Sequence, residues 1–286
     1  MNMELEKYHG LGNDYLVYDP QNAPFLFSEE QIRRICDRNF GVGSDGILYG
    51  PLFEEDKLKV RIFNPDGSEA EKSGNGVRIF SKYLKDAGYV TGDRFVLTTL
   101  GGDVKVEYLN ESGDLLKVEM GTVTYESGKI PVTGENRQVI DETMRFGNQE
   151  YRVTCLSIGN PHCVIPMEEI SREKACNLGP LVENSKHFPN RINMQLLKIL
   201  DRDTIQIEIY ERGAGYTLAS GSSSCAAASA AYKLGLVGRQ VDVRMPGGSL
   251  RIEISPDENV YMTGSVNIIG TVTLSPVFIK ELNMLE

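Results

Sequence analysis

The sequence predicts a mixed α/β fold of the α+β class, built as two pseudo-symmetric domains that each roll a sheet around a central helix. Three observations predict it. Motif positions recur once, at a displacement close to half of the 286 residues. Each half contains many strand-like runs, and each contains one helical stretch that follows a Ser-Gly pair and stops before a glycine. With 41% hydrophobic and 24% charged residues, the chain has the composition of an ordinary globular protein.

A displacement of 147 residues relates the two halves. The run KVRIFN ending at Asn64 recurs as QIEIYE ending at Glu211. One long repeat predicts two domains of like fold related by a pseudo-two-fold axis, whereas a solenoid needs shorter and more numerous repeats. Coincidence among glycine-rich turns is the alternative. The other recurring positions are Gly12-Asn13 with Gly159-Asn160, Ser73-Gly74 with Ser220-Gly221, Gly88 with Gly235 and, after one deletion, Gly101-Gly102 with Gly247-Gly248.

The domain boundary is expected between residues 120 and 130. There the stretch EMGTVTYESGKIPVTG turns polar and rich in glycine. We therefore expect an N-terminal domain at 1–124 and a C-terminal domain at 125–286, with the last strands able to cross back to the first half.

The first predicted helix covers 28–38. Ser28 can cap it, and Glu29 and Glu30 place acidic side chains in its first turn. Strand-like runs make up most of the rest of each half. They are DYLVYD, KVRIF, RFVLTT and DVKVEY in the first half and HCVIP and VDVRM in the second.

The two remaining helices follow the Ser-Gly pairs. Residues 75–86 carry apolar side chains at near-helical spacing, and Gly88 supplies a C-terminal stop. Residues 222–233 are rich in alanine and end before Gly235. Small side chains indicate close packing on all sides of a helix. A sheet wrapped around each helix would provide that packing.

Composition and targeting signals narrow the class of partner. A net charge of −10 without a basic run disfavours nucleic acid, whose affinity comes from Lys and Arg neutralising phosphates. No apolar stretch approaches the ~20 residues that a membrane helix needs, and the start MNMELEKYHG lacks the apolar core of a secretion signal. We expect a cytoplasmic protein with a small-molecule partner, and no membrane or nucleic-acid partner.

The cysteines and histidines do not predict a metal centre. The five cysteines are odd in number and form no CxxC pair, which suits reduced thiols. The three histidines are scattered and show no HExxH spacing. We expect neither a metal nor another cofactor.

The Ser-Gly pairs mark candidate anion sites. Ser73 and Ser220 lie where a strand gives way to a helix, and the first N–H groups of a helix lack intrahelical acceptors. Such groups attract a carboxylate or phosphate, and glycine lets a ligand approach the backbone. The alternative to an anion-binding role is that both serines are ordinary N-caps. As a symmetric pair they would hold one carboxylate and place one side chain on each face of the adjacent carbon.

That geometry fits two-base proton transfer at a stereocentre. One group removes a proton, the other returns one from the opposite face, and the configuration inverts without a cofactor. Thiols suit the task better than alcohols, because their pKa is about 8.5 and falls at a helix N-terminus.

The motifs resemble those of the diaminopimelate epimerase family, among the cofactor-independent amino-acid racemases. The resemblance covers essentially the whole chain. It is carried by HGLGNDYLVYD, GVGSDGIL, FNPDGSEAEKSGNGVRIF, GNPHCV, RIN and ERGAGYTLASGSSSCAA. It implies two α/β halves with the site in the cleft between them, an amino-acid substrate and a homodimer.

The family's site positions can be matched to this chain. The resemblance implies that the helix starts, with Glu211 and Arg212, hold the α-carboxylate and amine of the substrate. It implies that asparagines and Arg212 meet the far end, and that His162 supports a proton-transfer residue, the alternative being a surface-loop histidine. The helix-start residues are Gly74, Asn75, Gly76, Gly221 and Ser222, and the asparagines are Asn13, Asn64, Asn160 and Asn193.

The chain departs from the family at its two proton-transfer positions. Both are cysteine in the family, but serine stands at Ser73 and Ser220, and Cys225 lies more than one helical turn beyond. A natural serine variant with a different substrate, an inactive or engineered epimerase, an allylic or tautomeric isomerase, and a binding protein without turnover remain open. Gly46 is a further departure, because some relatives carry glutamine there, and Tyr216 either reshapes the distal pocket or packs on an adjacent strand.

Overall fold

The structure, a computed structural model, describes residues 3–71 and 73–285. The chain divides into two compact units. Unit 1 comprises Met1–Val118 and Gly264–Glu286, and unit 2 comprises Glu119–Thr263. Unit 1 thus gathers both ends of the chain, because a C-terminal strand pairs with the first strand of the sequence.

Unit 1 contains the first run of strands and helices. In chain order these are β1 (Glu4–Gly10), β2 (Asn13–Tyr18), α1 (Glu29–Cys36), β3 (Ile47–Glu54), β4 (Lys57–Phe63), β5 (Glu69–Ala70), α2 (Gly74–Asp86), β6 (Arg94–Thr99), β7 (Gly102–Tyr108) and β8 (Leu115–Thr122), whose last four residues belong to unit 2. The C-terminal segment adds β18 (Asn267–Thr273), antiparallel to β1, and α5 (Pro276–Leu282).

Unit 2 repeats this order from β10 onward. Its elements are the 3-10 turn η1 (Ser127–Lys129), β9 (Glu142–Phe146), β10 (Gln149–Ser157), β11 (Pro161–Pro166), α3 (Arg172–Glu183), β12 (Asn193–Ile199), β13 (Thr204–Glu211), β14 (Gly215–Thr217), α4 (Gly221–Lys233), β15 (Gln240–Met245), β16 (Gly248–Ile254) and β17 (Asn259–Ser265), whose last two residues belong to unit 1.

The strand pairings of the two units repeat as well. β2 pairs in parallel with β3, and β11 pairs in parallel with β12. β4 is antiparallel to β3 and parallel to β6, just as β13 is antiparallel to β12 and parallel to β15. The bounds of α2 and α4 differ by the predicted 147 residues at both ends. Coincidence among glycine-rich turns is therefore excluded.

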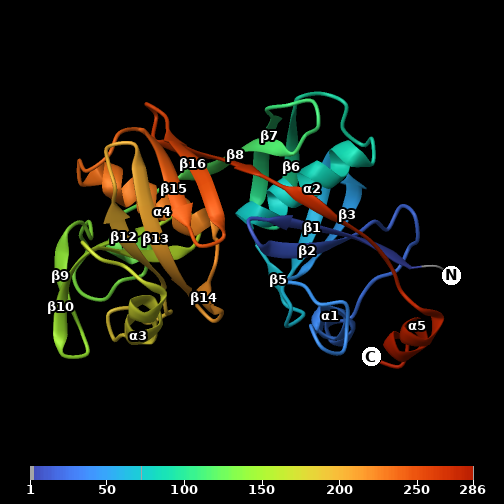
Figure 1. The fold of residues 1–286 in the computed structure, drawn as a ribbon, viewed down its shortest axis with the longest axis horizontal. Coiled ribbons are helices and arrows are strands. Elements are labelled where there is room, and N and C mark those ends of the chain that lie inside the picture. The colour runs from blue at the N-terminus through green and yellow to red at the C-terminus, as the bar shows by residue number, and fades with distance from the viewer. Residues whose placement is uncertain (1–2, 72, 286) are drawn as a thin grey trace. The chain divides into compact units, whose positions relative to one another are not determined.

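The central helices confirm the predicted fold class. In Figure 1, α2 lies among the strands of unit 1 and α4 among those of unit 2. Residues 74–84 of α2 are all buried, and five of the ten buried residues of α4 are alanine. An alanine-rich helix lets strands approach it closely from several directions, because its side chains add little to its diameter.

Most predicted elements are confirmed with small shifts at their ends. All six strand-like runs are strands. α1 has the expected Ser28 cap in a complete capping box but ends at Cys36, two residues before the predicted end. Gly88 and Gly235 adopt positive φ, 76° and 73°, just beyond α2 and α4.

Helices α3 and α5 are absent from the sequence prediction. Gly179 and Pro180 interrupt the helical pattern of α3. Gly179 is required by packing, since a Cβ there would come within 2.2 Å of the Tyr210 ring. α5 carries a signal that could have been used, because Ser275 accepts a hydrogen bond from the Phe278 N–H and Pro276 opens the helix.

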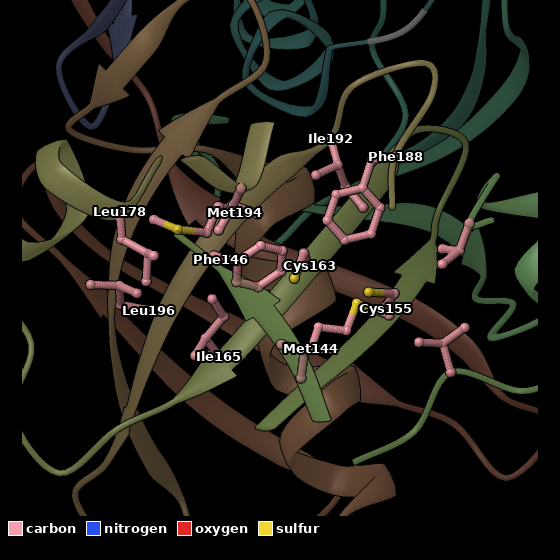
Figure 2. Packing of buried hydrophobic residues seen from close by; sticks show 14 of the residues in the cluster. Met144, Phe146, Cys155, Cys163, Ile165, Leu178, Phe188, Ile192, Met194 and Leu196 are labelled. Carbon is pink, nitrogen blue, oxygen red and sulfur yellow. The ribbon is translucent and has the colours of Figure 1, made fainter. Parts of the chain in front are cut away.

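The core beside α3 explains which side chains face α4. Cys163 and Ile165 of β11 and Met194 and Leu196 of β12 join a buried cluster with α3 and β9, part of which Figure 2 shows. Since successive strand residues point to opposite faces, the residues that alternate with these four face the other way, towards α4. His162 and Gln195 are among these residues.

No helix within 3–71 and 73–285 is long and apolar enough to span a membrane. Cys36, Cys155, Cys163 and Cys225 are buried, and Cys176 is exposed.

Candidate functional site

Ser73 and Ser220 occupy the same position in the two units. Ser73 is the N-cap of α2, and its Oγ accepts a hydrogen bond of 3.0 Å from the Gly76 N–H. Ser220 is the N-cap of α4, and its Oγ accepts one of 3.3 Å from the Ser223 N–H. Both have extended backbone geometry, with φ and ψ of −135° and 119° for Ser73 and −149° and 127° for Ser220. The N-cap interpretation therefore holds for both residues.

Capping leaves N–H donors available to an anion at each helix start. An N-cap side chain satisfies one of the first N–H groups, and the remaining ones have no intrahelical acceptor. In unit 1 these belong to Gly74 and Asn75, and in unit 2 to Gly221 and Ser222. The helix macrodipole adds a partial positive charge at the same place.

In unit 1 a chain of hydrogen bonds orients two of the predicted binding residues. The Arg78 guanidinium donates to Asn75 Oδ1 at 2.8 Å, and Asn75 Nδ2 donates to Asn13 Oδ1 at 3.0 Å. Asn13 Nδ2 then donates to Asp45 Oδ2 at 2.8 Å. Arg78 is fully buried, so its contact fixes which way the Asn75 amide points. The structure thus brings Asn13 and Asn75 together beside the start of α2.

Charged residues that the sequence did not reveal hold this series of hydrogen bonds in place. Arg38 donates to Asp14 at 2.7 Å and to Asp45 at 2.8 Å, and Lys7 pairs with Asp14 at 2.9 Å. Burial on its own raises the pKa of Asp14, but the hydrogen bonds from Arg38 and Lys7 outweigh it and lower that pKa. Asp45 therefore reaches Asn13 as part of a network whose carboxylates have cationic partners.

Asn64 lies in the turn after β4. Its side chain donates to Ser68 Oγ at 3.0 Å within that turn, and its backbone N–H bonds to the Ser68 carbonyl at 2.8 Å. Its predicted role in substrate binding stays a prediction.

In unit 2 the corresponding chain runs through His162. Gln195 Nε2 lies 3.0 Å from both His162 Nδ1 and Ser223 Oγ. When Gln195 donates to Nδ1, the imidazole proton is on Nε2, which donates to Asn160 Oδ1 at 3.0 Å. Asn160 Nδ2 donates in turn to Ser222 Oγ at 3.3 Å. Asn160 and Ser222 are therefore brought together at the start of α4.

His162 is a buried strand residue. The alternative of a surface-loop histidine is wrong, because His162 is in β11 and is 0% exposed. Burial lowers the pKa of His162 to about 3, and the Gln195 hydrogen bond opposes this only in part. The ring is neutral at pH 7 and acts on its surroundings as a hydrogen-bonding group.

Asn193 joins β11 to the turn after β13. Its Nδ2 donates to the Pro161 carbonyl at 2.8 Å, and its Oδ1 accepts from the Arg212 N–H at 2.9 Å. Buried Glu183, a further residue that the sequence analysis missed, pairs with Arg191 and accepts from the Gly213 N–H at 2.8 Å. These bonds fix the turn that carries Glu211 and Arg212, whose predicted roles stay predictions.

Tyr216 packs on an adjacent strand, which is the second of the two alternatives given for it. On β14, its hydroxyl donates to Glu208 of the adjacent strand β13 at 2.6 Å, and the Arg172 guanidinium lies 5.0 Å from its ring centroid.

Within the described ranges, no group of three or more His, Cys, Asp and Glu side chains gathers as a metal site. The two helix starts suit anions instead, since each combines N–H donors with uncharged amide and hydroxyl groups. In each unit a zwitterionic ligand's carboxylate could meet the helix start, and its ammonium could meet the amide oxygens.

Comparisons with known proteins place these features in a family. The sequence profile of the family described as "Diaminopimelate epimerase" matches residues 5–126 and 154–269. The chain is 52% identical over 274 residues to "Diaminopimelate epimerase 2" of Nostoc sp., covering 96% of both chains. It is 39% identical over 271 residues to "Diaminopimelate epimerase" of Moorella thermoacetica, covering 92% of this chain and 95% of the relative.

Solved structures share the fold at low identity. A hydroxyproline epimerase from Agrobacterium vitis aligns with a TM-score of 0.69 at 13% identity, covering 96% of this chain and 94% of that chain. A methylitaconate-delta-isomerase aligns with a TM-score of 0.64 at 10% identity, covering 96% and 95%. Identities this low show a common fold.

Proposed function

Because the chain belongs to the diaminopimelate epimerase family, we propose that it interconverts LL- and meso-diaminopimelate by inverting one α-carbon. Its class is that of the family: it is an isomerase of the epimerase and racemase type. Lysine biosynthesis is the pathway that this substrate suggests. A cytoplasmic homodimer completes the proposal.

The observation that carries the proposal is the repeated helix start. Two serines 147 residues apart cap equivalent helices, and beside each lies an asparagine with an oriented side-chain amide. In the proposed reaction the substrate carboxylate bonds to the free N–H groups of the helix starts. Inversion by this route requires Ser73 and Ser220 to act on opposite faces of the α-carbon.

The proton balance of the reaction is simple. The α C–H bond breaks as one serine, in its alkoxide form, takes the proton and becomes a hydroxyl. A C–H bond forms on the opposite face with the hydroxyl proton of the other serine, which is left as the alkoxide. The negative charge that develops on the carboxylate side is stabilised by helix-start donors already in place. Asn13, Asn75 and Asn160 offer amide groups to the ammonium and the distal end, and no cofactor is needed.

Exchange of the α-hydrogen with solvent tests the proposal. In D₂O, we expect LL- and meso-diaminopimelate to gain one α-deuterium faster with this protein than with the Ser73→Ala/Ser220→Ala variant. Mass spectrometry follows the gain. The control is Ser28→Ala/Ser171→Ala, which removes the N-caps of α1 and α3. Each N-cap loss costs about 1 kcal/mol of stability, so the two double variants are matched in stability and differ in the proposed site.

Two results would count against the proposal. The first is equal exchange by the parent protein and the Ser73→Ala/Ser220→Ala variant. The second is calorimetric binding of diaminopimelate without any exchange, which would identify an amino-acid-binding protein that lacks turnover.

A further inference from the structure

Tyr15 is placed against Ser73. Its hydroxyl lies 3.3 Å from Ser73 Oγ, and the residue is 6% exposed on β2. A phenol is more acidic than an alkyl alcohol and so is the better donor of the two. Ser73 Oγ then accepts two hydrogen bonds, from the Tyr15 hydroxyl and from the Gly76 N–H.

Gly46 allows the Tyr15 ring to lie there. Gly46 has φ of +154°, and a Cβ at this position would come within 2.7 Å of Tyr15 Cε1 and 2.3 Å of the Phe63 carbonyl oxygen. A residue with a side chain at 46 would have to displace the ring. The departure at Gly46 and the position of Tyr15 are therefore two parts of one arrangement.

The repeat makes the arrangement specific to unit 1. The residue related to Tyr15 by the 147-residue displacement is His162. His162 bonds to Asn160 and Gln195, so it supports the amide beside Ser222. Tyr15 bonds to the N-cap serine itself. The two helix starts thus differ in what surrounds the capping hydroxyl.

We propose that Tyr15 is a positioning residue for Ser73, to which its hydroxyl donates a hydrogen bond. In the hydroxyl form of Ser73 this bond directs the serine proton away from the helix, and in the deprotonated form it stabilises the oxygen. With two acceptor directions of Oγ occupied, the Ser73 hydrogen is directed away from both donors. Two donors also favour the form of the group that carries negative charge. The inference rests on the proposed function for its consequence in turnover, but the contact can be tested without turnover.

The test without turnover uses a thiol in place of the serine hydroxyl. In Ser73→Cys/Cys176→Ala, the exposed native thiol is gone and the other four native cysteines are buried. Alkylation by iodoacetamide then reports the thiolate at position 73 as a function of pH. Adding Tyr15→Phe should raise the midpoint of that profile by about one pH unit, because the thiolate loses a donor.

The matched control is Tyr18→Phe in the same background. Tyr18 is buried on the same strand, and its hydroxyl donates to the Ala23 carbonyl, away from the helix start. It should leave the midpoint unchanged. The charged groups of the surrounding network, Lys7, Asp14, Arg38, Asp45 and Arg78, are identical in both variants.

In the parent protein, Tyr15→Phe should lower the α-hydrogen exchange rate roughly 10-fold or more with KM little changed, and Tyr18→Phe should not. An alkylation midpoint that Tyr15→Phe leaves in place would overturn the inference. Absence of exchange in the parent protein would contradict the proposed function and leave the alkylation result to decide the role of Tyr15.

Discussion

Exchanging both N-cap serines for cysteine, in Ser73→Cys/Ser220→Cys, is expected to raise the α-hydrogen exchange rate of diaminopimelate by roughly 10³-fold or more. A positioned acid or base contributes about 10²–10⁴-fold when its pKa lies near the working pH, and two such groups act here. A thiol at a helix N-terminus meets that condition, whereas an alkyl hydroxyl does not. The backbone of both caps is already extended, so the thiols can occupy the same positions.

The single variants separate the two roles. Ser73→Cys and Ser220→Cys should each gain far less than the double variant, because inversion uses one group to remove the proton and the other to return it. The control is Ser28→Cys/Ser171→Cys, which places thiols at the N-caps of α1 and α3 and should leave the rate unchanged. No gain in the double variant would mean that the serines belong to a different chemistry.

Local signals made the fold predictable from the sequence. The Ser28 cap, the Ser-Gly pairs and the stops at Gly88 and Gly235 each act within one turn of a helix, so the sequence around them is enough. The repeat predicted two halves of like fold without any knowledge of strand pairing. α3 was not predicted because Gly179 interrupts its helical pattern. The reason for that glycine is its contact with the ring of Tyr210, which belongs to a strand distant in sequence.

The site was predictable in part for the same reason. The motifs located Asn13, Asn160 and both serines, but they did not reveal what holds the amides. Gln195 meets His162 only because β11 and β12 pair in parallel, and residues more than 30 positions apart therefore become neighbours. The burial of His162 was hidden because Gly-Asn-Pro resembles an exposed turn, although Pro161 begins a strand.

His162→Gln tests the buried, neutral state of that imidazole. The pKa of His162 is about 3 in the folded protein, below its ordinary 6.5, with burial as the largest cause. A depressed pKa means that the unfolded chain binds the proton more readily. The contribution of His162 to the free energy of unfolding is therefore fully present above pH 6.5 and is lost as pH falls from 6.5 towards 3. Between pH 7 and pH 5 the loss amounts to about 2 kcal/mol.

The measurement is urea unfolding of parent and variant at pH 7 and pH 5. Glutamine can keep a hydrogen bond to Asn160 without titrating, so the free energy of unfolding of the variant should fall about 2 kcal/mol less than that of the parent over this range. Carboxylates are common to both proteins and cancel in the comparison.

Parallel pH dependences for parent and His162→Gln would show that the buried ring takes up its proton over the same pH range as in the unfolded chain. The ring could then serve as an acid. The expected divergence has the opposite consequence for the reaction. A histidine that stays neutral down to about pH 3 does not supply a proton at neutral pH. In the proposed reaction it serves instead by fixing the Asn160 amide, and proton transfer falls to the side chains at positions 73 and 220.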